Sequence, residues 1–330
     1  MVDSVCVIIA AKNAAGTIGV AIGSALREAA VHEVIVIDDG STDHTARAAA
    51  AADDGSGRLR VITMEKNGGP AAARNHAIEV SRSPLIAILD ADDFFFPRRF
   101  APMLQEGEWD FVADNIAFTR EADGKTRPQP FEPRGRRLST LDFIEGNISQ
   151  PGKKRGEIGF LKPVMRRSFL DAHGLRYDET LRLGEDYDLY LRALLKGARY
   201  TVIEHCGYGA VVRPDSLSGQ HRTEDLRRLF KADQAILLEE PHLPADVATA
   251  LKRHEKHIRD RYELRAFLDV KRQSGKLAAF RHVTRNLRAL PAVAGGILRD
   301  KVQVLRKPVE DAAPEAGLRY LIPGVPLAQK

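Results

Sequence analysis

Carboxylate residues that directly follow apolar segments are the part of this chain whose types and spacing could do chemistry. Asp90-Ala91-Asp92 comes after the apolar run LIAIL, and Asp38-Asp39 comes after the run VIVI. Residues two apart in an extended segment point to the same side, so Asp90 and Asp92 can present their carboxylates together. Such acidic clusters are costly unless a positive charge joins them, and Mg²⁺ or Mn²⁺ binds through one or two carboxylates, phosphate oxygens and waters. The pattern therefore predicts a divalent cation with a diphosphate ligand.

Each of these motifs also has a simpler interpretation. An isolated Asp-x-Asp is more often a solvated turn, but its position immediately after a buried strand favours a ligand site. The sequence DDGSTD is good turn chemistry, and Thr42 or Asp43 can cap a following helix. We expect residues 41–43 to shape the turn while Asp38 or Asp39 faces the ligand. The sequence NGGPAAARN (Asn67–Asn75) is similar to a phosphate-binding loop only loosely, because it lacks the P-loop Lys-Ser/Thr and the Rossmann spacing.

The elements that must position these residues alternate between strand and helix. Ile18, Ala21, Ile22, Ala25 and Leu26 have the spacing of one helix face. Such an order predicts a mostly parallel α/β sheet, whose ligands bind beyond the carboxyl ends of its strands. The sequence AAKN (Ala10–Asn13) follows the first strand and is expected at that edge. The expected strands are Val5–Ala10, Val34–Ile37, Leu59–Thr63 and Leu85–Leu89, and the expected helices between them include Thr42–Ala52 and Ala71–Val80.

The later sequence is less regular. We expect further strands over Trp109–Phe118 and Glu157–Val164, a loop over Arg120–Arg137, and a helix from Asp186. The apolar face of this helix comprises Tyr187, Tyr190, Leu191, Leu194 and Leu195. Beyond about residue 221 the pattern is helical and polar. We therefore predict a nucleotide-binding domain over 1–220, a basic helical extension over 221–307, and a loosely ordered tail over 308–330.

Composition and charge limit the other classes of protein. Two cysteines are too few for a disulfide framework, and neither a signal peptide nor an apolar stretch of membrane-spanning length is visible, so we expect a cytoplasmic protein. Arg222–Lys307 holds 20 Lys and Arg against 11 Asp and Glu, whereas the rest of the chain has a net charge of −4. This segment lacks aromatic interleaving and zinc-ligand spacing, so nucleic acid is not an expected partner. An anionic membrane surface is an expected partner of this basic segment.

Five ordered motifs carry a family resemblance: IIAAKNAAGTIGVAIGSAL, VIVIDDGSTDHTA, NGGPAAARNHAI, ILDADDFFFPRRF and GEDYDLYLRAL. The chain resembles family 2 glycosyltransferases with the GT-A fold from about Val5 to Ser218. The phrases DFVADNI and GEDYDLYLRALLKGARY are similar to the sugar transferases of succinoglycan-type exopolysaccharide assembly.

The resemblance implies a role for each motif. Asp39 would contact the uracil or its ribose, Asp90 the ribose, and Asp92 the metal that bridges the phosphates. Asp186 would be the general base, with Glu185 beside it on the acceptor side. Arg213 lies where the family has a flexible basic segment over the diphosphate. The full set of implied nucleotide-sugar-binding residues is Ala10, Lys12, Asn13, Asp39, Arg74, Asp90, Ala91 and Arg213.

Two departures from the family pattern affect this assignment. The family has Pro and an aromatic residue where this chain has Ala10 and Lys12, and the aliphatic stem of Lys12 could replace the aromatic against the base. A His usually follows the late Arg, but Pro214 and Asp215 follow Arg213 here.

The implied reaction is an inverting transfer from UDP-glucose to a hydroxyl of a glycan, with a polyprenyl-linked oligosaccharide as the candidate acceptor. Alternative classes are a sugar-nucleotide pyrophosphorylase, whose Gly-rich basic loop after the first strand is missing here, and an inactive membrane-docking or nucleic-acid-binding protein. We expect a peripheral location on the cytoplasmic face of the inner membrane, through a helical face of the basic segment; a solvated helix face is the alternative. The basic residues considered for that face are Lys252, Arg253, Lys256, Arg259, Arg281, Arg285 and Arg288.

Overall fold

The computed structural model describes residues 4–122, 127–131, 134–149, 157–212, 222–305 and 318–322. By its internal contacts the chain divides into two compact units. The first unit comprises Met1–Pro214 and Ala313–Lys330, and the second unit comprises Asp215–Ala312. Each unit is described by itself below.

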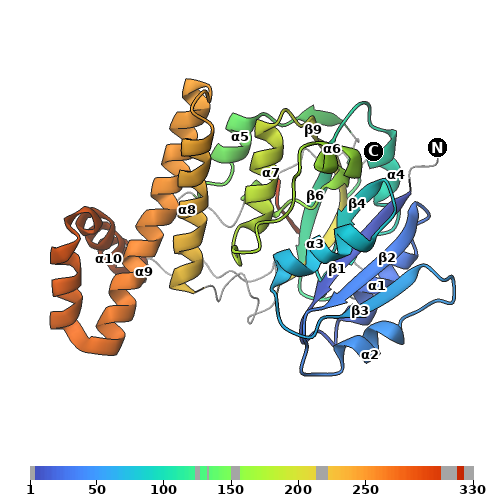
Figure 1. Ribbon diagram of the computed structural model, residues 1–330, viewed down its shortest axis with the longest axis horizontal. Helices are drawn as coiled ribbons and strands as arrows, with labels where there is room; N and C mark the ends of the chain where they lie inside the picture. The colour runs from blue at the N-terminus through green and yellow to red at the C-terminus, as the bar shows by residue number, and fades with distance from the viewer. Residues whose placement is uncertain are drawn as a thin grey trace. The chain divides into compact units, whose positions relative to one another are not determined.

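Among its described residues the first unit is built on a mixed sheet of ten strands. Eight of them follow the order β3-β2-β1-β4-β8-β6-β9-β5, while β10 pairs with β6 and β7 pairs with β9. Strands β1, β2, β3, β4, β6 and β9 are labelled in Figure 1. The strands are β1 (Val5–Ala11), β2 (Val31–Asp38), β3 (Leu59–Thr63), β4 (Leu85–Ile88), β5 (Phe94–Phe95), β6 (Phe111–Thr119), β7 (Gly135–Arg137), β8 (Val164–Arg166), β9 (Tyr200–Val211) and β10 (Arg319–Tyr320).

The part of the sheet formed by the first four strands is parallel, as the sequence predicted. Strand β1 lies between β2 and β4. From β1 the chain continues through β2 and β3 on one side of β1, and it then crosses to the other side of β1 to form β4. This reversal of strand order is a topological switch point, where side chains following adjacent strands can surround a ligand. The residues that follow β1, β2 and β4 are those that the sequence analysis selected.

The helices of the first unit are α1 (Ile18–Leu26), α2 (Thr45–Ala50), α3 (Pro70–Val80), α4 (Phe100–Gln105), α5 (Thr140–Glu145), α6 (Arg167–Ala172) and α7 (Glu185–Leu195), with a 3₁₀ turn η1 (Ile158–Phe160). The predicted apolar face of α1 is buried at all five positions. Helix α3 packs on β1 and β2, and α1 packs on α2 and β5. On α7, Tyr187, Tyr190, Leu191 and Leu194 are buried as predicted, whereas Leu195 is half-buried.

The second half of the sheet differs from the expectations at three places. Residues 157–164 are not a strand: η1 comes first, and only Val164 enters β8, which pairs antiparallel with β4 and β6. The range expected as a loop after β6 contains β7, which pairs with β9. Residues 318–322, in the range expected to be a loosely ordered tail, include β10, which pairs with β6. With these antiparallel pairs the sheet is mixed and still mostly parallel, as expected.

The second unit is helical and consists of α8 (Thr223–Glu239), α9 (Ala245–Arg285), the 3₁₀ turn η3 (Leu287–Ala289) and α10 (Leu290–Leu305). Gly275 breaks α9 because its φ of 83° is not helical, and it is a backbone angle that L side chains rarely adopt. The segments on either side of Gly275 are therefore separate helices. No helix among the described residues is long and apolar enough to cross a membrane.

Candidate active site

Two buried cations join carboxylates from distant parts of the first unit. Arg74 on α3 contacts Asp90, which follows β4 (Nη2 to Oδ1, 3.0 Å), and Lys162, which precedes β8, contacts the other oxygen of Asp90 (Nζ to Oδ2, 3.0 Å). The same cations reach α7. Arg74 Nη1 lies 2.9 Å from Glu185 Oε1 and 3.2 Å from Asp186 Oδ1, and Lys162 Nζ lies 2.8 Å from Asp186 Oδ2. We refer to these five residues as the ion cluster.

The ion cluster is mostly buried, and Asp90 is its most exposed member. The side chains of Arg74 and Lys162 are 5% and 6% exposed, whereas that of Asp90 is 34% exposed. Burial opposes ionisation of Asp90, but the charges of Lys162 and Arg74 outweigh it and lower the pKa of Asp90 to about 2. Burial likewise opposes charge on Lys162, and Asp186 and Asp90 outweigh it and raise the pKa of Lys162. The cations are therefore held charged by the carboxylates around them.

Glu185 is the exception in this cluster. Burial raises the pKa of the Glu185 carboxyl above its ordinary value, and the neighbouring charge of Asp186 adds to the increase, although Arg74 opposes it. Two adjacent carboxylates thus have different environments. Asp186 contacts both cations, whereas Glu185 contacts Arg74.

Asp39 positions the start of α3 and, through it, Arg74. Its two carboxylate oxygens accept from the backbone N–H groups of Gly68 (2.6 Å) and Gly69 (2.9 Å), and Pro70 then begins the helix. A Cβ at Gly68 would lie 2.9 Å from the Ala72 Cβ, and Gly69 has a φ of +90°, so this approach requires both glycines. Asp39 was predicted to contact the nucleotide base or ribose; the structure also gives it this structural role.

A buried ion pair holds Lys162 in place. Arg99 and Asp114 are both 0% exposed and 2.9 Å apart, and Arg99 Nη2 also donates to the backbone carbonyl of Lys162 (2.6 Å). Asp114 accepts in addition from the backbone N–H of Gly207 on β9 (2.6 Å). The ammonium of Lys162 is thus positioned from β6 and β9 as well as by its own partners.

Aromatic packing fixes α7. Tyr187 stacks on Phe143 of α5 with ring centroids 5.6 Å apart and an interplanar angle of 10°, and Tyr190 lies edge-on to Phe111 and Tyr200. These rings hold the helix against α5, β6 and β9, so the carboxylates of its first turn have a fixed direction.

The residues that follow β1 lie against the turn that follows β2. Ala10 is half-buried near the end of β1, and Lys12 Nζ donates to the backbone carbonyls of Asp39 (3.2 Å) and Gly40 (3.1 Å). Asn13 donates its backbone N–H to Ser41 Oγ (2.9 Å), and its Oδ1 accepts from the backbone N–H of Thr42 (2.8 Å). The stem of Lys12 therefore crosses from the end of β1 to the end of β2.

The turn after β4 carries three acidic residues, Asp90, Asp92 and Asp93, of which Asp90 is paired with Arg74 and Lys162. Ala91 is buried and Asp92 is half-buried. Burial and the charges of Asp90 and Asp92 raise the pKa of Asp93, which accepts from the Tyr208 hydroxyl (2.8 Å). The described residues contain no group of three His, Cys, Asp or Glu side chains that could hold a metal ion. Mg²⁺ needs only one or two carboxylates when a substrate phosphate and waters complete its shell, so the oxygen ligands here fit such an ion.

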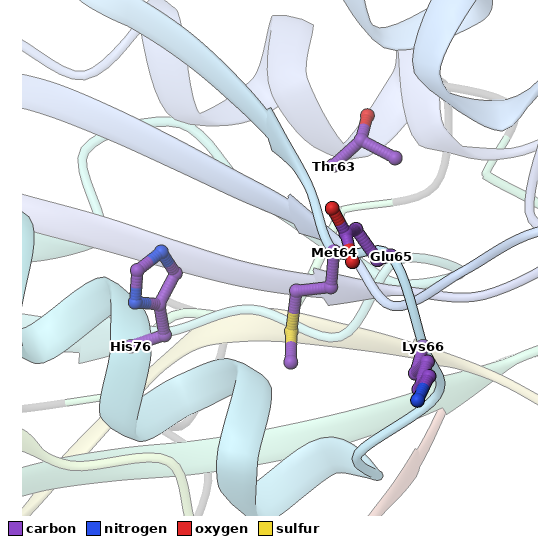
Figure 2. A pocket seen from close by; sticks show the side chains of 5 residues that line it. All are labelled: Thr63, Met64, Glu65, Lys66 and His76. Atoms are coloured by element: carbon purple, nitrogen blue, oxygen red, sulfur yellow. The ribbon is translucent and has the colours of Figure 1, made fainter.

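A surface cavity of about 400 Å³ lies beside β3, apart from these charged groups. Figure 2 shows its five lining side chains, which come from β3, the turn after it, and α3: Thr63, Met64, Glu65, Lys66 and His76. None of them belongs to the ion cluster or to the residues predicted for the site. We take the site to be the carboxyl edge of β1, β2 and β4, because the charged groups converge there.

Of the predicted residues, Arg74, Asp90, Glu185 and Asp186 come together directly, and Lys12, Asn13 and Asp39 form a second group at the ends of β1 and β2. Arg213 lies outside the described residues. Lys162 was not predicted from the sequence. The sign of its role there is a single lysine in the apolar sequence GFLKPVM, because a buried charge requires partners.

A mixed α/β sheet with acidic groups at its switch point is typical of nucleotide-sugar transferases of the GT-A fold. The family description "Glycosyl transferase family 2" matches residues 6–172, and the chain belongs to this family. It is therefore a glycosyltransferase.

Among characterised sequences, the chain is 59% identical over 326 residues to the succinoglycan biosynthesis protein ExoU of Rhizobium meliloti (strain 1021), covering 96% of this chain and 95% of that protein. It is 35% identical over 282 residues to ExoO of the same organism, also named a succinoglycan biosynthesis protein, covering 83% and 78% of the two chains. Among solved structures, S. aureus TarS 1-349 superposes with a TM-score of 0.59 at 19% identity, covering 88% of this chain and 80% of that one. A complex of the same fragment with UDP-GlcNAc superposes with a TM-score of 0.57. At this identity the structural likeness shows the GT-A fold alone.

Proposed function

We propose that the chain transfers glucose from UDP-glucose to a hydroxyl of a glycan acceptor, with inversion at the anomeric carbon. The observation that supports this most directly is the link between Asp186 and Asp90 through Arg74 and Lys162. Asp90 follows β4 at the switch point, where the donor is expected, and Asp186 begins the helix that the family resemblance assigns to the acceptor. Transfer requires the two substrates to meet within about 3–3.5 Å, and the shared cations hold the two sides in a fixed relation.

Asp186 acts as the general base in this proposal. The acceptor oxygen attacks the anomeric carbon while the bond from that carbon to the diphosphate breaks, and the hydroxyl proton passes to Asp186. The products are the new glycoside and UDP, and a single displacement needs no covalent intermediate. The first turn of α7 favours a negative charge at Asp186 through the helix dipole. Glu185 orients the acceptor.

The donor lies along the carboxyl ends of β1, β2 and β4. Asp39 contacts the uracil or ribose, Asp90 contacts the ribose, and the stem of Lys12 takes the place of the family's aromatic residue. Asn13, Arg74 and Ala91 complete the described part of this site. The UDP-GlcNAc complex of TarS, which has the same fold, supports a UDP-linked donor; glucose rests on the resemblance to succinoglycan-type enzymes.

Asp92 would hold a divalent cation, Mg²⁺ or Mn²⁺, against the diphosphate. Such an ion, when bound, would act as a Lewis acid on the departing diphosphate. This assignment rests on the position of Asp92, two residues after Asp90 in the turn that follows β4.

The acceptor in this proposal is a polyprenyl-linked oligosaccharide of succinoglycan-type exopolysaccharide assembly. Two relatives named for succinoglycan biosynthesis, which match 96% and 83% of the chain, support this pathway. A lipid-linked acceptor places the enzyme at the cytoplasmic face of the inner membrane.

A donor panel tests the proposal. Purified protein is incubated with UDP-glucose, UDP-galactose, UDP-GlcNAc and GDP-mannose, with and without Mn²⁺, and release of UDP or GDP is measured with a lipid-linked glycan acceptor. We expect the fastest release from UDP-glucose with Mn²⁺, and a β-linked product from the α-linked donor by NMR. Release from a GDP-sugar alone, or a product that keeps the α configuration, would contradict the proposal.

A further inference from the structure

The positive charge of the second unit is confined to its distal part. Residues 222–269 contain ten Lys and Arg and ten Asp and Glu, so their net charge is zero. Residues 270–299 contain seven Lys and Arg and no acidic residue. The basic residues of the first half of α9, such as Lys252 and Arg253, therefore sit in a neutral helix pair. The excess charge belongs to the end of α9, η3 and the start of α10, which we call the basic hairpin (residues 270–299).

The basic hairpin also exposes large apolar side chains. Of the large hydrophobic residues that the described part of the chain exposes, five lie between residues 277 and 298, and each is 52–69% exposed. These five are Leu277, Phe280, Leu287, Leu290 and Leu298. Exposed apolar residues scattered singly need no explanation, but such a concentration indicates a binding surface.

The apolar residues of α9 share a helical face with positive charge, and those of α10 form an exposed apolar face. On the last part of α9, Leu277, Phe280, Arg281 and Thr284 have the spacing i, i+3, i+4 and i+7, and all are exposed. On α10, Leu290, Ala294 and Leu298 repeat every four residues on an exposed face.

The opposite faces of the hairpin pack in a core that they share with the preceding part of α9. Val283, Ala289 and Val293 are buried together, with Phe267 and Ile297 packed against them, and a Cβ at Gly296 would lie 2.5 Å from Leu264. The fold of the hairpin therefore does not require the outward apolar residues, which remain available to another surface.

We propose that the basic hairpin docks on the surface of an anionic lipid bilayer. The exposed Lys and Arg residues would face the phosphate groups of the lipids: Lys271, Arg272, Lys276, Arg281 and Arg285. Leu277, Phe280, Leu287, Leu290 and Leu298 would enter the boundary between headgroups and acyl chains. A lipid surface fits better than a second copy of the chain, because a copy would bring an equally positive hairpin against this one. A nucleic acid would satisfy the charge but not the apolar side chains. The membrane contact expected for the basic segment Arg222–Lys307 is thus assigned to the surface of residues 270–299.

The test uses the full chain and sedimentation with sucrose-loaded vesicles of phosphatidylcholine alone or with about one-third phosphatidylglycerol, at low salt. Two variants remove the proposed contacts, L277S/F280S and R281Q/R285Q. Two matched controls lie in the same unit outside the hairpin: Leu238→Ser removes a side chain that is 82% exposed, and K252Q/R253Q removes two charges. Circular dichroism checks that all four variants fold.

We expect binding to anionic vesicles only, a loss of about tenfold or more in the partition coefficient for each hairpin variant, and less than twofold for each control, in line with the attraction of basic and apolar residues to anionic interfaces. The proposal is overturned by equal binding to both vesicle types, by hairpin variants that bind like the wild type, or by controls that lose as much binding. It is also overturned if sedimentation shows a dimer that the hairpin variants dissociate, or if the hairpin variants lose binding to duplex DNA but not to vesicles. The assay does not measure sugar transfer, so its outcome is independent of the proposed reaction.

Discussion

Replacing Asp186 by Asn removes the proposed proton acceptor and keeps the shape of the side chain. The carboxylate of Asp186 accepts one hydrogen bond from Lys162 and one from Arg74. Each charge-assisted bond contributes about 1.5–3 kcal/mol, and the amide of Asn can replace one of the two as a neutral bond. Lys162 keeps Asp90 as a partner, and Arg74 keeps Asp90 and Glu185. We therefore expect the free energy of unfolding to decrease by about 2–4 kcal/mol.

The chemical effect should be larger than the structural one in the folded fraction. Loss of a positioned general base lowers kcat by about 10²–10⁴-fold, which corresponds to about 3–5.5 kcal/mol of transition-state free energy. UDP affinity, measured by calorimetry with Mn²⁺, should change little, because Asp39, Asp90 and Asp92 are unchanged. Turnover is measured as UDP release well below the thermal transition, so that both proteins are folded.

Asp188→Asn is the matched control for this experiment. Asp188 lies on the same helix, is buried, and forms its own ion pair with Arg192 (2.6 Å). This variant loses the same charge and a similar hydrogen bond, so its stability should fall comparably while kcat stays within a few-fold of the wild type. The reasoning is refuted if Asp186→Asn keeps near-normal turnover, if Asp188→Asn loses as much, or if Asp186→Asn loses UDP affinity together with activity.

Three further predictions concern the metal, the pH dependence and the buried ion pair. Asp92→Ala should fold normally, yet Mn²⁺ should no longer strengthen UDP binding in calorimetry; an unchanged Mn²⁺ effect would count against Asp92 as the metal ligand. Because burial and neighbouring carboxylates raise the pKa of Asp93, the folded chain holds this proton more tightly than the unfolded chain. Stability from this group therefore falls as the pH rises above the ordinary carboxyl value of about 4. The free energy of unfolding of Asp93→Asn and of the wild type is measured by urea denaturation at pH 5 and pH 8. The variant should gain stability relative to the wild type at the higher pH, and the same difference between the two proteins at both pH values would contradict this. Arg99→Met should lower the free energy of unfolding by about 3–5 kcal/mol, because it leaves Asp114 buried without its ion-pair partner. Arg98→Met, at the exposed neighbouring position, should lower it little. Equal losses of stability in the two variants would show that the ion pair is unimportant.

The sequence predicted the elements whose signal is local. Strands β1 to β4 are short apolar runs, and the carboxylates that follow them are visible in the sequence, so that edge of the sheet could be located in advance. Strand β9 could not, because Glu204 and His205 interrupt its apolar pattern and its register against β6 shifts near Asn115.

The same distinction applies within the site. Asp90 and Asp186 stand in recognisable motifs, but the role of Lys162 depends on contacts with residues far away in the chain. Its ammonium contacts Asp186 and Asp90, and its carbonyl accepts from Arg99. A periodic pattern contains no information about such contacts, so a buried lysine can be suspected from sequence, but its partners cannot be named.

Strand β10 gives the helical unit the character of an insertion. Val211, at the end of β9, lies opposite Thr119, and Arg319 of β10 lies opposite the adjacent Phe118 on the same strand. The Asn115 side chain then pairs with both the N–H and the carbonyl of Ile322 (2.9 and 2.7 Å). The chain thus leaves the sheet and rejoins it at neighbouring positions, and an insertion at such a point can be exchanged, enlarged or removed while the host sheet keeps every strand.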